Sequence, residues 1–129
     1  MEVNGSGKNP TDKLAIKCYE MMKKMYSKEY SEILEMFFGI SITQIKSAQN
    51  NELLSFNPEP FCIINLPIPS KNSTISITDC LDEYCKSERL ENENAYLNET
   101  TGIKEAVDKG VIFWSLPTIL IIDLKRYDM

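Results

Sequence analysis

Hydrophobic residues recur at helical spacing near the start of the chain. The residues that follow this spacing are Leu14, Cys18, Met21, Met22 and Met25. They share one face of a helix, so the pattern predicts an amphipathic helix whose methionines fill gaps in the core. Thr11 or Asp12 is the expected N-terminal cap. Residues 1–10 carry Gly, Ser, Asn and Pro with little apolar content, and we expect a flexible leader there.

A second, shorter helix is predicted from about Ser31. Its apolar residues are Ile33, Leu34, Phe37 and Phe38. Gly39 follows directly, and glycine suits the left-handed conformation that often ends a helix. We therefore expect Gly39 to be the C-terminal cap.

Isoleucines and polar residues then mix at strand-like spacing from residue 40 to residue 45, which predicts an outgoing strand. A returning strand is predicted over 52–56, and the polar residues 47–51 form the turn between them. We expect Pro58 and Pro60 to break the ladder, because proline has no backbone N–H to donate.

Another strand is predicted over 61–66, ended by the prolines that follow it. Ser76 and Asp79 then have the spacing of a capping box, in which each residue's side chain satisfies the other's backbone N–H. The helix that they begin carries its apolar face on Ile77, Cys80, Leu81 and Tyr84.

The last apolar segment predicts two long strands joined at Leu116-Pro117. Residues 119–122 are an unbroken aliphatic run, which is typical of a strand covered on both faces. Such a strand needs neighbours that the chain has little sequence to supply. We therefore expect part of a larger domain, with an exposed sheet edge and a tendency to self-associate.

Composition narrows the class of protein. The chain has 129 residues, of which 43% are hydrophobic and 26% are charged, as in an ordinary globular domain. Its net charge of −5 argues against nucleic acid as a partner, since phosphates are bound by clustered positive charge. No apolar run is long enough to span a membrane and the N-terminus does not resemble a signal peptide. The expected compartment is the cytoplasm or the nucleus.

The cysteines do not form a recognisable reactive site. Cys18, Cys62, Cys80 and Cys85 contain no Cys-x-x-Cys pair, and we expect four free thiols that are mostly packed as small apolar groups. The chain contains no histidine, so neither Cys/His nor Ser/His/Asp catalysis can be completed within it. No catalytic residue and no cofactor are predicted.

Four segments, taken in order, resemble the middle of the catalytic domain of the ubiquitin-specific proteases, a family of thiol-dependent deubiquitinases. The segments are Ile33–Gly39, Ser55–Ile68, Ser76–Tyr84 followed by Asn94-Ala95-Tyr96, and Leu116–Tyr127 with its Leu-Pro, aliphatic and Leu-Lys-Arg-aromatic pattern. The resemblance implies an α+β fold over 11–129, a partial papain-like catalytic domain. In it, N-terminal helices precede mostly antiparallel fingers and palm strands with one inserted helix.

The resemblance also implies what this chain lacks. Active members carry a cysteine box upstream of this region and a histidine box downstream, and neither is in this sequence. Many members bind a structural zinc through two Cys-x-x-Cys pairs at the tips of the fingers. The matching positions here are Ser47, Asn50, Asn98 and Thr101. Without thiolate or imidazole ligands we expect no zinc site, and hence mobile tips at 46–51 and 97–102.

Three hypotheses for function follow. The first is a fragment or degenerate copy of a ubiquitin-specific protease that keeps the part gripping ubiquitin or its conjugates and cleaves nothing by itself. The second is a non-catalytic ubiquitin-binding or scaffold module. The third is an independent α+β interaction domain with no affinity for ubiquitin.

Overall fold

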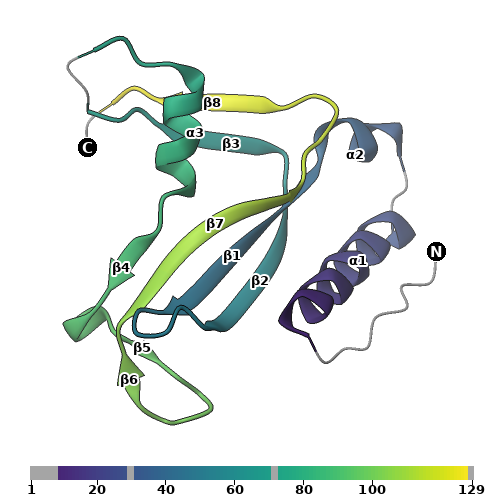
Figure 1. Ribbon diagram of the computed structural model, residues 1–129. Helices are drawn as coiled ribbons and strands as arrows, with labels where there is room; N and C mark the ends of the chain where they lie inside the picture. Colours follow the sequence, from purple (N-terminus) through teal and green to yellow (C-terminus); the bar gives the residue numbers. More distant parts are fainter. Residues whose placement is uncertain (1–8, 29–30, 71–72, 128–129) are drawn as a thin grey trace.

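The computed structural model describes residues 9–28, 31–70 and 73–127, which form an α+β fold (Figure 1). Its helices are α1 (Pro10–Lys28), α2 (Glu32–Phe37), α3 (Ile77–Cys85) and the single-turn η1 (Asn92–Asn94). Its strands are β1 (Gly39–Ser47), β2 (Leu53–Phe61), β3 (Ile63–Pro67), β4 (Glu88–Leu90), β5 (Tyr96–Leu97), β6 (Lys104–Glu105), β7 (Val107–Ser115) and β8 (Ile121–Lys125). The predicted order of N-terminal helices, hairpin and inserted helix is confirmed.

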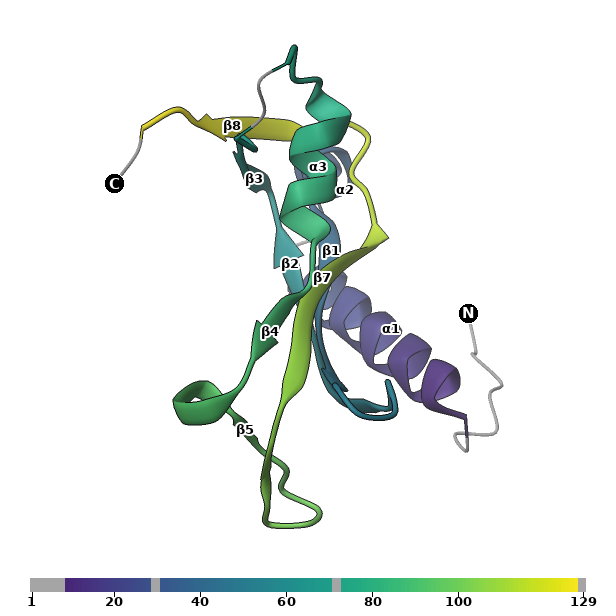
Figure 2. The same ribbon diagram turned by 60° about the vertical axis from the view of Figure 1, so that its left-hand side comes forward.

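The main sheet is antiparallel and has four strands in the order β2-β1-β7-β4. β1 pairs along nearly its whole length with β2 on one side and β7 on the other. β7 is long and curved, and it runs from the hairpin at the bottom of Figure 2 toward the part of the molecule that holds α3 and β8. Ile40 and Ile42 of β1 are 1% and 0% exposed, so the centre of the sheet is also the centre of the fold.

Helix α1 lies against one face of this sheet, beside β1 and β2 (Figure 1). Leu14 and Cys18 of α1 form a buried cluster with Ile42, and Phe56 and Trp114 pack against it. The predicted apolar face is thus confirmed at its first two members. Its methionines, Met21, Met22 and Met25, are only half-buried, because α1 extends beyond the buried cluster.

The N-terminal cap of α1 differs from the prediction. The Asn9 side chain accepts a hydrogen bond from the Thr11 N–H at 3.1 Å, and the Asn9 carbonyl accepts one from Lys13. Pro10 occupies the first helical position, where its missing N–H costs nothing. The helix therefore begins at the end of the expected leader; residues 1–8 lie outside the described residues.

A second cluster is built from β3, β8 and α3. β3 and β8 pair in parallel, which the mostly antiparallel prediction did not specify. Ile64, Leu66 and Cys80 are buried together there. α3 begins with the predicted capping box: the Ser76 Oγ accepts from the Asp79 N–H at 3.2 Å, and the Asp79 carboxylate accepts from the Ser76 N–H at 2.9 Å. Parallel strands need a long connection between them, and α3 is part of the connection from β3 to β8. It packs over both strands.

The two prolines do not interrupt β2, contrary to the prediction. Pro58 pairs with Ile42 and Pro60 with Ile40, and the strand continues to Phe61. β2 is at the edge of the four-stranded sheet. The prolines are two residues apart, so both backbone nitrogens face the same side of the strand. An edge strand has one side without a neighbouring strand, and a proline nitrogen on that side leaves no ladder bond unmade.

Gly39 is not a helix cap, which corrects a second prediction. Phe38 ends α2 in an extended conformation, and Gly39 is the first residue of β1. A Cβ at Gly39 would collide with the Ser115 carbonyl oxygen and lie 2.7 Å from the Phe61 ring. The glycine is needed because β2 and β7 approach the backbone closely there.

The aliphatic run 119–122 is not covered on both faces within the described residues. β8 begins only at Ile121, and the described part of the chain pairs it with β3 alone. Ile121 is 37% exposed, Ile119 is 45% exposed, and Ile63, the partner of Ile121, is 53% exposed. One face of β3–β8 packs on α3, and the other remains accessible.

The four-stranded sheet ends in a tip formed by the β1–β2 turn and the β5–β6 hairpin (Figure 1). Gly102 has a φ of 70° in the hairpin loop, a conformation that favours glycine. No described helix has the length and apolar character needed to cross a membrane.

We predict that Gly39→Ala lowers the free energy of unfolding by about 1–3 kcal/mol, because the added methyl group meets backbone and a packed ring. Chemical denaturation monitored by circular dichroism measures this change. Gly110→Ala is the matched control, since its Cβ would lie 2.9 Å from the Ser87 Oγ, which can rotate away. Equal losses in the two variants would contradict this account of Gly39.

Candidate functional site

The face of the sheet opposite α1 carries two rows of side chains. Alternate residues of a strand point to opposite faces, so the residues beside Ile42 in sequence point away from α1. One row runs across all four strands as Ser55, Ile45, Lys109 and Glu88, and the next contains Asn57, Thr43 and Val111. We call these seven residues the open strip.

Both ends of the open strip are bounded by other elements. At one end Phe61 and Phe113, which point to this face, pack with their ring centroids 5.4 Å apart and join the α3 cluster. Tyr84 of α3 stacks on Phe113 at 5.9 Å. At the other end Ser47 and Val107 are 4% and 0% exposed beneath the tip. The strip therefore lies between the α3 cluster and the tip.

The strip has a half-buried apolar centre and a polar rim. Ile45 and Val111 are half-buried, and neither belongs to the two buried clusters. Asn57, Lys109 and Glu88 are exposed around them. An apolar centre with a polar rim is the usual composition of a protein-binding surface. The strip fits a folded partner better than a small molecule, because it is a sheet face and not a cavity.

An ion pair holds the outer strand of the strip in place. The Arg89 Nη2 donates to the Asp108 Oδ2 at 3.1 Å, linking β4 to β7. This hydrogen bond, together with the positive charge of Arg89, lowers the pKa of the Asp108 carboxyl. Arg89 is exposed and Asp108 is only half-buried, so water screens the pair, and we assign it a role in alignment and not a large share of stability.

Three hollows in the described part of the chain do not assemble reactive groups, and two of them touch the strip, at Asn57 and at Val111. Two cavities of about 320 and 390 Å³ lie between α1 and β2 and share Lys17, whose ammonium lies 4.7 Å from the Phe56 ring centre. A smaller one of about 140 Å³ includes Cys85 and Lys46. Burial, and then the Asp82 charge, raise the pKa of the Cys85 thiol, which is the opposite of what a nucleophile needs.

The four cysteines are free thiols, as predicted. Cys18 and Cys80 are buried, while Cys62 and Cys85 are half-buried. Burial also raises the pKa of the Cys18 thiol. Among the described residues, no three acidic or thiol side chains are grouped so that they could hold a metal.

The four positions that match zinc ligands in the resemblance all lie at the tip, but only two of them, Ser47 and Asn98, share a partner, which is Glu105. The Glu105 Oε2 accepts from the Ser47 hydroxyl at 3.0 Å, and the Glu105 Oε1 accepts from the Asn98 Nδ2 at 2.6 Å. Asn50 instead bonds to Glu52, and Thr101 to the Ile103 N–H. Hydroxyl and amide groups already committed to these bonds do not fit a tetrahedral zinc ion.

Sequence reasoning missed Glu105. It is one of 19 acidic residues in the chain, and nothing in its neighbours marks it. Its two partners lie 58 and 7 residues away, so only the folded arrangement reveals the contact.

No protein-family model matches the chain. Among curated proteins, it is 32% identical over 124 residues to a probable ubiquitin carboxyl-terminal hydrolase of Acanthamoeba polyphaga mimivirus, covering 93% of this chain and 26% of that protein. It is 31% identical over 108 residues to ubiquitin carboxyl-terminal hydrolase 4 of Saccharomyces cerevisiae, covering 82% and 12% of the two chains. It is 31% identical over 113 residues to human ubiquitin carboxyl-terminal hydrolase 21, covering 83% and 19%.

The chain is therefore a distant homologue of a portion of the ubiquitin carboxyl-terminal hydrolases, the family of the ubiquitin-specific proteases. This confirms the resemblance seen in the sequence. The chain spans between 12% and 26% of the length of these relatives, so it corresponds to one section of each of them.

We predict that the chain binds no stoichiometric zinc. Equilibration with Zn²⁺, removal of free metal and elemental analysis measure the bound fraction. The positive control replaces the four tip positions by cysteine, Ser47→Cys, Asn50→Cys, Asn98→Cys and Thr101→Cys, which supplies the thiolate ligands that zinc prefers. One tightly held zinc per unmodified chain would contradict the prediction.

Proposed function

We propose that this chain is the ubiquitin-gripping section of a ubiquitin-specific protease, present here as a fragment or a degenerate copy, and that it binds ubiquitin without cleaving it. The observation that carries the proposal is the homology of 93% of the chain to part of a ubiquitin hydrolase. The four-stranded sheet corresponds in this proposal to the fingers of the protease, and β3–β8 with α3 to part of the palm.

The open strip is the surface that we assign to ubiquitin. It lies between the two ends of the sheet, whereas α1 already covers much of the opposite face beside β1 and β2 (Figure 1). Its apolar residues Ile45 and Val111 can be desolvated by a partner, and the surrounding polar groups can set the orientation. A folded protein such as ubiquitin has the size to contact both rows at once.

Catalysis is not assigned to this chain alone. With no histidine, none of its thiols has the imidazole base that a cysteine hydrolase uses. Longer natural versions that carry the missing boxes would hydrolyse ubiquitin conjugates through a thiol. A reducing compartment, the cytoplasm or nucleus, suits both such an enzyme and four free cysteines.

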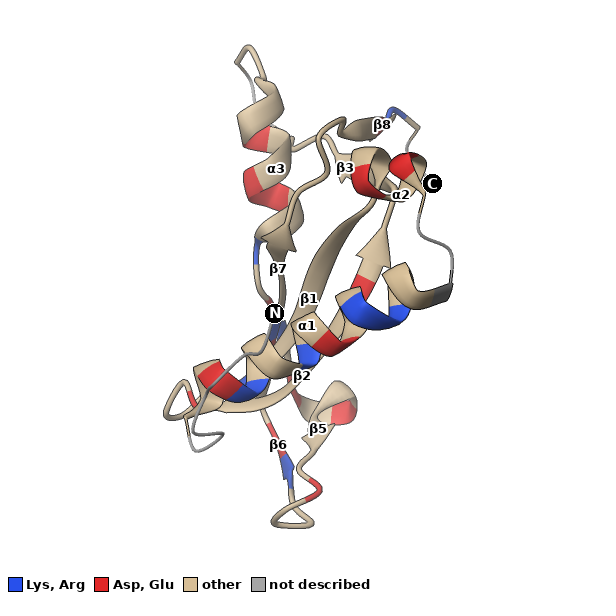
Figure 3. Ribbon diagram, turned by 90° about the vertical axis from the view of Figure 1, so that its right-hand side faces the viewer, with Lys and Arg blue, Asp and Glu red and all other residues tan. Residues whose placement is uncertain are grey.

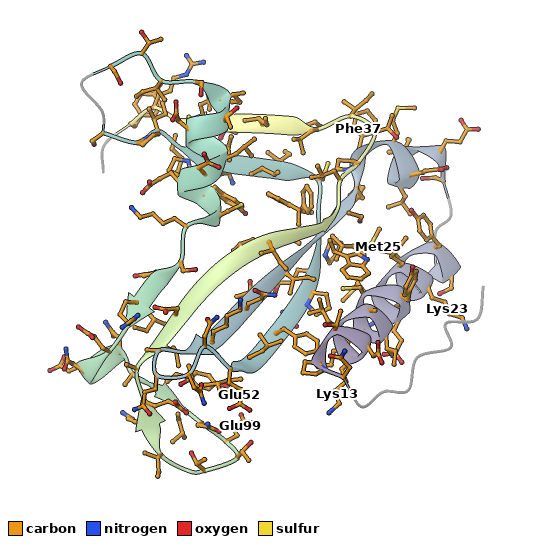
Figure 4. The ribbon with its side chains drawn as sticks, in the orientation of Figure 1. Lys13, Lys23, Met25, Phe37, Glu52 and Glu99 are labelled. Carbon is orange, nitrogen blue, oxygen red and sulfur yellow. The ribbon has the colours of Figure 1, made fainter. Side chains whose placement is uncertain are left out.

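Titration of isotope-labelled ubiquitin with this chain tests the proposal. We expect localised amide shift changes on ubiquitin. Lys109→Glu reverses a charge on the strip and should weaken binding by about 1 kcal/mol, roughly fivefold. Lys23→Glu is the matched control, because Lys23 lies on the outer side of α1 (Figure 4) and should leave affinity unchanged.

Two other outcomes would each overturn part of the proposal. Absence of any shift change, with the chain shown to be folded, would favour an interaction or scaffold module that does not bind ubiquitin. Equal weakening by Lys109→Glu and Lys23→Glu would show binding through net charge and not through the strip.

We also propose that the isolated chain self-associates through β3–β8. The parallel pair has one accessible face, and its apolar end holds Ile63 and Ile121 side by side with Ile119 nearby. Further along the same face, Asn65 pairs with Asp123 and Pro67 with Lys125. In the described residues each of these strands has a single neighbour, so unpaired backbone groups remain at the edges.

Sedimentation velocity over a range of protein concentrations measures this association. Ile121→Lys should shift the chain toward monomer, because it places a charge on the accessible face. Ile103→Lys makes the same change at the tip, where Ile103 is 66% exposed, and should have little effect. A wild-type chain that remains monomeric at every concentration would contradict the proposal.

A further inference from the structure

Glu105 joins two turns that are far apart in sequence. Its two carboxylate oxygens accept from different partners, the Ser47 hydroxyl at the end of β1 and the Asn98 amide just after β5. The bonds measure 3.0 and 2.6 Å. Hydrogen bonds to an ionised carboxylate are stronger than those between neutral groups. One side chain thus connects the four-stranded sheet to the β5–β6 hairpin.

Each partner of Glu105 also orders its own turn. The Ser47 Oγ accepts from the Gln49 N–H at 3.3 Å, and the Asn98 Oδ1 accepts from the Thr100 N–H at 3.0 Å. The carboxylate is therefore the centre of a chain of hydrogen bonds that includes both turns. Within such a chain the bonds polarise and strengthen one another.

Apolar packing does little to hold the hairpin in place. β5 and β6 pair over only two residues each, and an isolated two-stranded hairpin is marginally stable. Its large aliphatic residues, Leu97 and Ile103, are 52% and 66% exposed. Beneath the hairpin, Ser47 is 4% exposed, so its hydroxyl needs a protein partner.

We infer that Glu105 is a carboxylate clasp that fixes the β5–β6 hairpin to the end of the main sheet without a metal ion. Ser47 and Asn98 occupy two of the four positions where the resemblance places zinc ligands, and Glu105 links these two directly. The clasp sets the position of the tip that bounds the open strip. That last consequence rests on the proposed function, whereas the clasp itself does not.

Amide hydrogen exchange measured by NMR, without ubiquitin, tests the clasp. The backbone N–H groups of Ala48 and Asn98 report on the tip, because they donate to the carbonyls of Ala106 and Ile103. Glu105→Ala should speed their exchange by about 10- to 100-fold, because it removes two charge-assisted bonds that close the tip. Amides at the centre of β1 should change far less. Glu105→Gln keeps the shape and one acceptor oxygen, and should give an intermediate increase.

Glu99→Ala is the matched control. Glu99 is an exposed acidic residue of the same hairpin loop, labelled in Figure 4, and removing it changes the net charge equally. In the Glu99→Ala variant, the exchange rates of the Ala48 and Asn98 backbone amides should stay within about twofold of wild type. The double variant Ser47→Ala/Glu105→Ala should add little to Glu105→Ala at the Asn98 amide, since both changes break one network.

The clasp is overturned if Glu105→Ala leaves the tip amides unchanged, or if it speeds exchange equally throughout the sheet. If Glu105→Ala fails to fold, the exchange rate of the Asn98 backbone amide is measured in Glu105→Gln and Ser47→Ala instead. An unchanged rate in both variants would likewise overturn the clasp. Ubiquitin affinity is then compared between Glu105→Ala and Glu99→Ala. Faster tip exchange with unchanged affinity would keep the clasp and reject its role in positioning the strip.

Discussion

The pairing of β1 with a strand on each side is the constraint on which the rest of the structure depends. β1 aligns β2 and β7 in register, so side chains on one face meet α1 and those on the other form the open strip. Ile40 and Ile42 exclude water from the middle of this pairing. Gly39 permits this pairing at the start of β1, because a side chain there would clash with Phe61 of β2 and with the Ser115 carbonyl of β7.

Charged side chains are placed differently on α1 and on the open strip. In Figure 3 the outward side of α1 carries both basic and acidic residues, as expected for a surface helix facing water. The open strip has fewer charges and two aliphatic residues at its centre. β3 and β8 differ again, since their accessible face has an apolar end formed by Ile63 and Ile121. Parallel strands are normally covered on both faces, so this pair has the character of a section of a larger sheet.

Local patterns in the sequence predicted the elements whose determinants are local. The 3.6-residue spacing of Leu14 and Cys18, the Ser76–Asp79 capping box and the polar turn at 47–51 each depend on residues within one element, and the structure agrees with all three. The resemblance to the protease family also came from sequence alone, and homology confirms it.

The predictions that failed depend on long-range contacts. Whether a proline interrupts a strand depends on whether the strand is central or at the edge of the sheet, and Pro58 belongs to β2, an edge strand. Gly39 looked like a helix cap because its crowding by Ser115 lies 76 residues away in sequence. Glu105 could not be found for the same reason, since its importance comes from the meeting of two distant turns.

An NMR titration in which this chain carries the isotope label shows directly whether the open strip binds ubiquitin. If the strip is the binding surface, unlabelled ubiquitin shifts the backbone amide signals of Thr43, Ile45, Val111 and their row neighbours, while those of α1 stay in place. Shifts concentrated on α1 would contradict this assignment, as would the absence of any shift on a chain whose spectrum shows it to be folded.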